Sequence, residues 1–248
     1  MRKILLFAII PSVLLLASCK KDPETFQSPP VSEYYPLVVG KYITYQLDSL
    51  RYINFGTRDT TISYQVKHTV DALTTDALGR PAYRIIRSIR KTPANPWTPD
   101  NTFMAVPTDF AMEFIENNLR FLKMKAPIRN GSSWKGNTYI DTYSFGSDLK
   151  YLAGWDYTFD SVDAPITLGA FTLDSTLKIN QRDEVIGNPG IPTAYSERNL
   201  GIEKYAKGIG MIYRRFLHQE YQPPTTPGGS GKYSDFSYGV TMTMIDHN

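Results

Sequence analysis

The sequence Phe-Ser-Tyr-Gly-Val-Thr-Met-Thr-Met at positions 236–244 alternates large apolar side chains with small or polar ones without a break. Successive side chains of a β-strand point to opposite faces of the sheet, so this period of two predicts a strand with one apolar and one solvated face. Such strands are typical of antiparallel sheets, which pack one face on the core. The C-terminal segment therefore predicts an antiparallel β protein.

The same alternation recurs upstream. Residues 43–48 and 62–70 alternate on either side of the break at 55–59, which predicts a long hairpin. Further strands are expected at 82–89, 103–106 and 171–179, and at 211–221. The Pro- and Gly-rich stretch 221–232 is expected to be a surface loop between strands, because the 16 residues after it cannot form a core alone. We expect a mainly β fold with little helix: one antiparallel curved sheet or partly open β-barrel over residues 34–248.

One segment, Phe110 to Lys125, fits two structures. Apolar side chains recur in it at helical spacing, and Thr108 or Asp109 is a suitable N-cap. Asn117-Asn118 favours a hairpin instead, since asparagine tolerates the left-handed backbone that a tight turn requires. We favour two strands, 110–116 and 119–125, with the helix as the open alternative.

The N-terminus has the features of a secretory signal. Arg2 and Lys3 precede an apolar run of 13 residues, 4–16, which is too short to span a bilayer as a helix. The sequence Leu16-Ala17-Ser18-Cys19 that follows resembles the lipobox of bacterial lipoproteins. This resemblance implies a signal peptide over residues 1–18 and an acylated Cys19, carrying palmitate-type chains, as the new first residue. The protein is then anchored to a membrane without spanning it.

Residues 19–33 are expected to form the lipidated cysteine and a flexible tether, because they are polar and punctuated by proline. The run Lys20-Lys21-Asp22-Pro23-Glu24 resembles the charged stretch after the cysteine in lipoproteins of the Bacteroidota type. That resemblance implies that the protein is anchored to the outer membrane, and it leaves open whether the protein faces the periplasm or the cell surface.

Charge and cysteine content exclude some classes of function. The 27 basic and 24 acidic residues give a formal charge of +3, and removing residues 1–18 with Arg2 and Lys3 leaves a charge of +1. Nucleic-acid binding needs a clustered positive excess, so no nucleic-acid partner is expected. Cys19 is the only cysteine, which excludes an intramolecular disulfide.

Three stretches carry a second resemblance: 35–45, which opens with Tyr-Pro-Leu-Val-Val-Gly, 127–137 with Gly-Ser-Ser-Trp, and 205–213 with Ala-Lys-Gly-Ile-Gly. Together they resemble an uncharacterised family of β-rich bacterial lipoproteins. By architecture alone, the chain is also loosely similar to the half-barrel carriers that move lipoproteins across the periplasm. These resemblances imply a fold, and a fold does not fix a function.

Cofactor and metal motifs are weak. Gly208 and Gly210 begin like a dinucleotide fingerprint, but Tyr213 stands where the third glycine belongs and a strand follows, so we expect a turn. The three histidines, His68, His218 and His247, are far apart in sequence and lack metal-site spacing. We predict no cofactor, no metal site and no recognisable catalytic residue. His68 lies in phase with apolar neighbours and is expected to be buried and neutral.

Asp156 and Asp160 share one face of a predicted strand whose other face carries Trp155, Tyr157 and Phe159. A solvated strand face is the favoured interpretation, and a glycosidase-like carboxylate pair is the other. The sequence thus favours a non-enzymatic envelope module that binds a hydrophobic ligand or a protein partner. The alternatives are a carbohydrate or peptide hydrolase with an unrecognised carboxylate pair, and a purely structural envelope role.

Overall fold

The computed structural model describes residues 27–248. Its elements are α1 (Val31–Tyr34), β1 (Tyr42–Ile53), β2 (Arg58–Thr75), β3 (Pro81–Arg90), β4 (Thr98–Pro107), β5 (Ala111–Glu116), β6 (Leu119–Lys125), β7 (Ser133–Lys135), the 3₁₀ turn η1 (Lys150–Leu152), β8 (Asp156–Leu168), β9 (Phe171–Gly187), β10 (Ser196–Ala206), β11 (Gly210–Gln222), β12 (Lys232–Tyr233) and β13 (Tyr238–His247).

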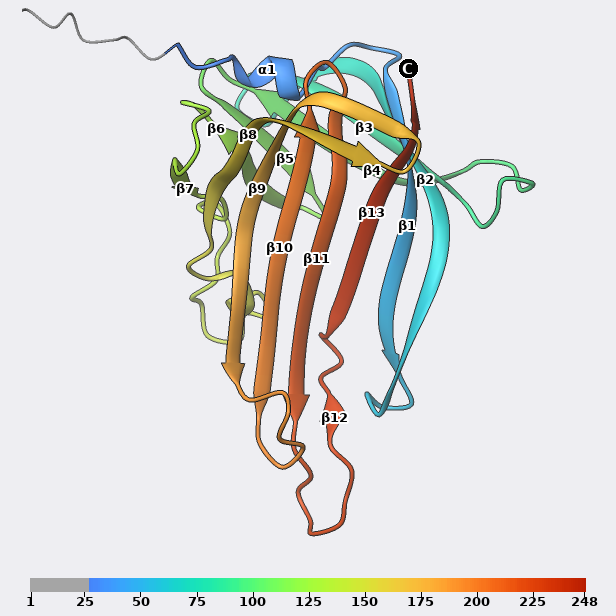
Figure 1. Ribbon diagram of the computed structural model, residues 1–248, viewed down its shortest axis with the longest axis vertical. Helices are drawn as coiled ribbons and strands as arrows, with labels where there is room; N and C mark the ends of the chain where they lie inside the picture. The colour runs from blue at the N-terminus through green and yellow to red at the C-terminus, as the bar shows by residue number, and fades with distance from the viewer. Residues whose placement is uncertain (1–26) are drawn as a thin grey trace, which may run out of the picture.

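All the strands belong to one antiparallel sheet, in the order β6-β5-β4-β3-β2-β1-β13-β11-β10-β9-β8-β7, with β12 paired to β11. The sheet curls into a nearly closed barrel (Figure 1). The predicted fold class is therefore confirmed, and so is the hairpin β1–β2, in which Tyr45 pairs with Val66. The C-terminal strand β13 begins at Tyr238 rather than at Phe236, and Phe236 and Tyr238 are 55% and 37% exposed, so the predicted apolar face does not extend to these two residues. Further along β13, Met242 and Met244 are each 2% exposed, as the alternation predicts.

The hairpin predicted between 110 and 125 is confirmed as β5 and β6, and the helical alternative is wrong. Asn117 and Asn118 have φ angles of 52° and 61°, so both adopt the left-handed conformation of a tight turn. Phe114 pairs with Phe121 across the hairpin. The two asparagines decide between the structures because a helix does not accommodate two successive left-handed residues.

Strand β4 is longer than the predicted 103–106, since it begins at Thr98 and includes Pro99. Pro99 pairs with Ser88 next to a register shift in β3. Proline cannot donate to a ladder and is tolerated at such irregularities.

The two end strands of the sheet, β6 and β7, meet at a seam that is bridged rather than fully paired. The amide of Leu122 donates to the carbonyl oxygen of Gly136 at 2.8 Å. The indole of Trp134, 6% exposed, donates to the carbonyl oxygen of Leu122 at 2.7 Å. Single bonds of this kind bridge the seam without a continuous ladder, so the barrel is only nearly closed.

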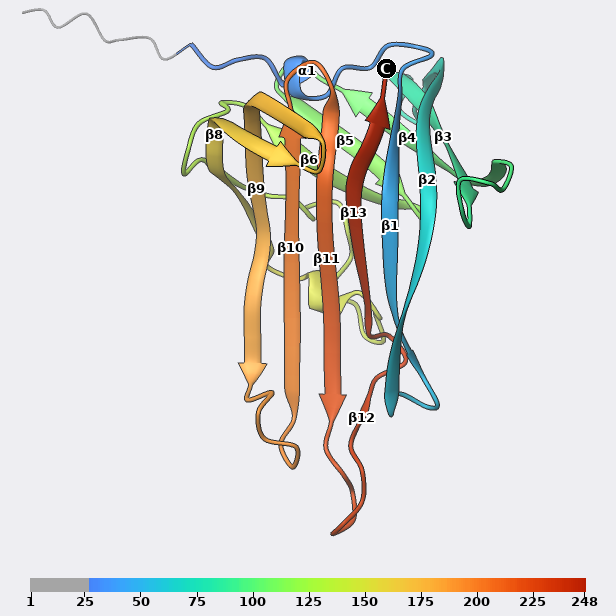
Figure 2. The same cartoon turned by 45° about the vertical axis from the view of Figure 1, so that its right-hand side comes forward.

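The two ends of the barrel differ. Strands β9, β10 and β11 and the hairpin β1–β2 run beyond it at one end, whereas α1 lies across the other end beside the β10–β11 turn (Figures 1 and 2). There the amide of Gly208 donates to the carbonyl oxygen of Glu33 at 2.7 Å. Val31 and Tyr34 of α1 are 5% and 0% exposed. Val31, which the sequence suggested lay in the tether, therefore packs into the core.

The predicted signal peptide and Cys19 lie outside the described residues, so lipidation stays a prediction. Over residues 27–248, no helix is both long and apolar enough to cross a membrane.

Candidate functional site

A pocket opens at the end of the barrel where α1 lies, and it encloses about 650 Å³ including the open space at its mouth. Its apolar wall comes from segments on both sides of the barrel: Tyr35, Pro36, Leu37, Ile43, Val70, Ile85, Phe114, Ile209 and Met211. Gly210 lies at the pocket wall with φ +118°, and a Cβ there would lie 3.1 Å from the Cδ1 atom of Ile43. A small residue at this position keeps the wall open.

Deeper in the pocket, the lining changes from apolar to charged: Glu116, Lys123, Glu203 and Arg214. Each of the four charges lies two positions from an aromatic residue of the same strand face: Glu116 from Phe114, Lys123 from Phe121, Glu203 from Tyr205 and Arg214 from Phe216. We call these four side chains the lumen charge cluster.

Two ion pairs of this cluster join distant parts of the sheet. Arg214 holds Glu116 with two parallel bonds, Nη1 to Oε2 at 2.8 Å and Nη2 to Oε1 at 2.9 Å. Lys123 Nζ lies 2.6 Å from Oε1 of Glu203. Because β10 and β11 are roughly half-way round the strand order from β5 and β6, these bonds cross the lumen. The cluster therefore ties the two halves of the barrel together.

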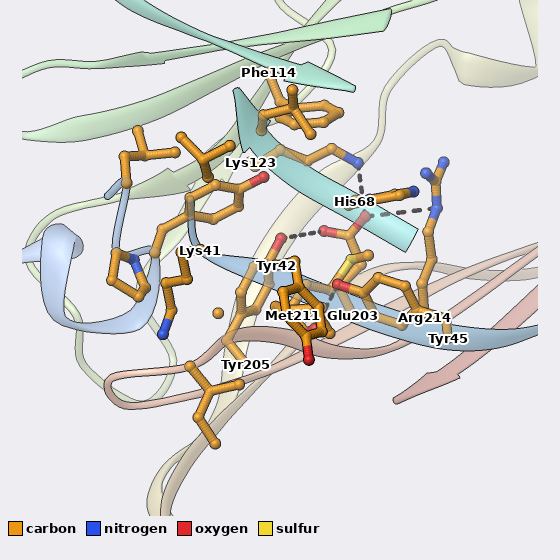
Figure 3. A pocket seen from close by; sticks show the side chains of 18 of the residues that line it. Lys41, Tyr42, Tyr45, His68, Phe114, Lys123, Glu203, Tyr205, Met211 and Arg214 are labelled. Atoms are coloured by element: carbon orange, nitrogen blue, oxygen red, sulfur yellow. Dashed lines mark hydrogen bonds and ion pairs between the residues drawn. The ribbon is translucent and has the colours of Figure 1, made fainter. Parts of the chain in front are cut away.

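Glu203 is the centre of the cluster. Its side chain is fully buried, and Oε2 accepts a bond from the hydroxyl of Tyr205 at 2.7 Å. Figure 3 shows Lys123, Tyr205 and Arg214 converging on this carboxylate. Burial by itself raises the pKa of Glu203, but the charges of Lys123 and Arg214 outweigh that effect and lower it. Glu203 is therefore a carboxylate at neutral pH.

Glu116 behaves in the same way. Burial raises its pKa, but Arg214 and Lys123 more than compensate and lower it to about 2. A glycosidase needs one carboxyl group with a raised pKa that can donate a proton. The two carboxylates of this pocket are both held in the ionised form, which suits structural pairing and ligand placement better than general acid catalysis.

The prediction that His68 is buried and neutral agrees with the structure in part. Its imidazole lies edge-on between the rings of Tyr45 and Phe103, at centroid distances of 5.1 and 5.3 Å. Burial, reinforced by the charge of Arg87, lowers the pKa of His68 to about 3, so the ring is uncharged. The side chain as a whole is only half-buried and lines the pocket. Its Nε2 atom is buried without a hydrogen-bond partner among the described residues.

A second pocket lies on the other side of Glu116 and Arg214, which line both. Aromatic side chains form part of its lining, among them Phe216 and Tyr238, whose rings stack at 5.2 Å. Trp155, behind this lining, stacks on Phe216 at 5.6 Å. Gly201 makes room for this arrangement, because a Cβ there would lie 2.7 Å from Cζ3 of Trp155. The Glu116–Arg214 ion pair therefore separates the two pockets of the barrel lumen.

Asp156 and Asp160 lie outside the pockets. Both are exposed on β8 and pair with lysines, Asp156 with Lys135 at 2.6 Å and Asp160 with Lys178 at 2.7 Å. Trp155, Tyr157 and Phe159 on the opposite face are 2%, 2% and 0% exposed. The solvated-face interpretation is confirmed for this strand.

The other two histidines are separate from the pocket. His218 is 4% exposed, stacks on Tyr151 at 4.0 Å and shares a 2.8 Å hydrogen bond with Asn199. His247 packs near Phe171. Across residues 27–248, no group of three or more histidine, cysteine or acidic side chains is placed to hold a metal ion. Gly208 and Gly210 form the expected turn between β10 and β11.

A second charged cluster has a structural role. Asp76 accepts bonds from the amides of Leu78 and Arg80 at 2.9 and 3.0 Å, and Arg80 also reaches Glu113 at 2.7 Å. Arg120 contacts Glu113 as well. Hydrogen bonds from Arg80 hold the pKa of Asp76 well below its usual range. These contacts fix the β2–β3 turn to the β5–β6 hairpin.

Sequence reasoning missed the lumen charge cluster. A signal was present, since Glu116, Lys123 and Arg214 each lie two positions from a phenylalanine of the same strand face, Phe114, Phe121 and Phe216. A charge on such a strand face is either buried with a partner or unfavourable. The strand face alone does not identify the partners, which come from strands far apart in the chain.

The free energy of unfolding is expected to fall as the pH is lowered from about 4.5 to about 2. A group whose pKa is lowered by folding contributes stability above its unfolded pKa and loses it as pH falls through the folded value. For Glu116, whose pKa falls from 4.5 to about 2, this contribution is about 3 kcal/mol. Urea unfolding between pH 7 and pH 2 measures it. In Glu116→Gln the free energy of unfolding should fall less steeply with pH than in the wild type. An equal fall in both proteins would show that Glu116 does not contribute to the pH dependence.

No model of a known family matches the chain, and no curated protein matches it. It is distantly similar to a solved structure from Bacteroides fragilis, described as a presumed exported protein with a YmcC-like fold, at 10% identity and a TM-score of 0.43. The similarity covers 87% of this chain and 98% of that one. A likeness at this level supports no inference about function.

Proposed function

We propose that this protein is a non-enzymatic binding module of the cell envelope that holds a small hydrophobic ligand in the pocket beside α1. Acylated Cys19 anchors it to the outer membrane in this proposal. The observation that supports binding is the pocket itself, with apolar walls above a charged floor whose carboxylates are paired and ionised. Ligand sites are typically concave and mostly apolar, with a few polar groups that orient the ligand.

Native mass spectrometry of the lipidated protein, extracted from its own envelope in mild detergent, tests this function. We expect a small amphiphilic adduct on the wild type. Ile209→Trp, which narrows the pocket, should remove the adduct, whereas Ile245→Trp should retain it, because Ile245 is 38% exposed and lies outside the pocket. A heavier complex with a protein in place of the adduct would favour the partner-binding alternative. An adduct that survives both changes would exclude this pocket.

A further inference from the structure

Two buried nitrogen atoms of the pocket lack hydrogen-bond partners among the described residues: Nε2 of His68 and Nε of Arg214. Both residues line the pocket. Arg214 uses Nη1 and Nη2 on Glu116, and its Nε lies 3.7 Å from Glu203, beyond hydrogen-bond distance. Buried polar groups are nearly always hydrogen-bonded, so two such atoms in one pocket require an explanation.

The chemistry of the two atoms limits what can satisfy them. Arg214 Nε–H is a donor only, whereas Nε2 of the uncharged His68 is either a donor or an acceptor, depending on the tautomer. A ligand oxygen that accepts a hydrogen bond from Arg214 Nε can also form one with Nε2 of His68. A hydroxyl group can also donate to His68, and an ester carbonyl can accept from it.

The lumen charge cluster, which forms the floor of the pocket, favours a neutral head group of the ligand over an ionic one. Glu116 and Glu203 carry two negative charges, which the two positive charges of Lys123 and Arg214 already neutralise through the bonds described above. Lys41 also lines the pocket, but its ammonium group points away from the lumen charge cluster (Figure 3), and its Nζ donates to the main-chain oxygen of Asn248 at 2.9 Å. An added carboxylate or ammonium group in the floor would be a buried charge without a counter-charge, which is strongly unfavourable.

We infer that the pocket selects an uncharged oxygen head group, a hydroxyl or an ester carbonyl, held between His68 Nε2 and Arg214 Nε with the apolar body of the ligand against the wall. This inference rests on the proposed ligand-binding function and names the class of ligand. His68 and Arg214 come from β2 and β11, so the head group would lie between the two sides of the lumen.

Three probes with the same alkyl chain and different head groups test the inference: 1-octanol, octanoate and octylammonium. Each is titrated calorimetrically into the lipidated protein in detergent. For the wild type we expect 1-octanol to bind at least tenfold more tightly than either ion. In His68→Phe, 1-octanol should bind about three- to tenfold more weakly, as for one lost hydrogen bond. Partition of 1-octanol into detergent is the same for every variant. Differences in its affinity between variants therefore reflect binding in the pocket.

Two further variants control the result. His247→Phe replaces an imidazole outside the pocket and should leave 1-octanol binding unchanged. His68→Gln keeps a side chain that can hydrogen-bond and should retain part of the affinity that His68→Phe loses. Tighter binding of octanoate or octylammonium than of 1-octanol, or equal 1-octanol affinity in the wild type and His68→Phe, would overturn the inference. No binding of any probe, with no native adduct, would instead reject the proposed function.

Discussion

Lys123→Ala is expected to lower the free energy of unfolding by about 3–5 kcal/mol, because removing one partner of a buried ion pair leaves an uncompensated charge. The side chains of Lys123 and Glu203 are 5% and 0% exposed, and their charged atoms lie 2.6 Å apart. Without Lys123, the remaining cation at Glu203 is Arg214, whose Nε is 3.7 Å away and whose outer nitrogens are committed to Glu116. Urea unfolding at pH 7, followed by tryptophan fluorescence, measures the change.

The matched control is Lys178→Ala. Lys178 makes an ion pair of nearly the same length with Asp160, 2.7 Å, but the two side chains are 32% and 45% exposed. Exposed pairs contribute about 0–1 kcal/mol, so this variant should be close to the wild type. Similar losses at both lysines would mean that the lumen is wet enough to screen the Lys123–Glu203 pair.

Cys19→Ser is expected to move the protein from the membrane fraction to the soluble fraction. Each buried CH₂ of an acyl chain contributes about 0.8 kcal/mol to membrane binding, and two chains or more anchor a protein stably. Serine cannot carry the thioether-linked lipid that the lipobox implies, and the predicted tether contributes little apolar surface. Fractionation of cells followed by immunoblotting measures the redistribution.

A salt wash of the membrane fraction is the control, since it removes proteins held by charge alone and leaves acylated ones. The wild type should stay with the membranes after the wash. If Cys19→Ser protein also stays there after the wash, then another part of the chain anchors it and the lipoprotein prediction is wrong.

The sequence carries local information about the fold, and this is why the strands could be predicted. Alternation with period two depends only on neighbouring residues, so it identified β1, β2, β3, β9, β11 and β13. The turn at Asn117-Asn118 was also readable, because the left-handed preference of asparagine acts within one residue. The start of β4 was predicted at 103 rather than at Thr98, because the irregularity in the partner strand β3 that accommodates Pro99 is a non-local feature.

The candidate site could not be predicted in the same way. His68 was noticed, but Glu116 and Arg214 are 98 positions apart, and Lys123 and Glu203 are 80 positions apart. Closure of the barrel, rather than any local preference, brings these pairs together across the lumen. The sequence by itself determined an antiparallel β protein and its main hairpins, since those depend on short-range periodicity. Only the tertiary structure decided which charges meet, and therefore where the pocket lies and which of its polar atoms remain for a ligand, because burial and Coulomb interactions depend on distance in space.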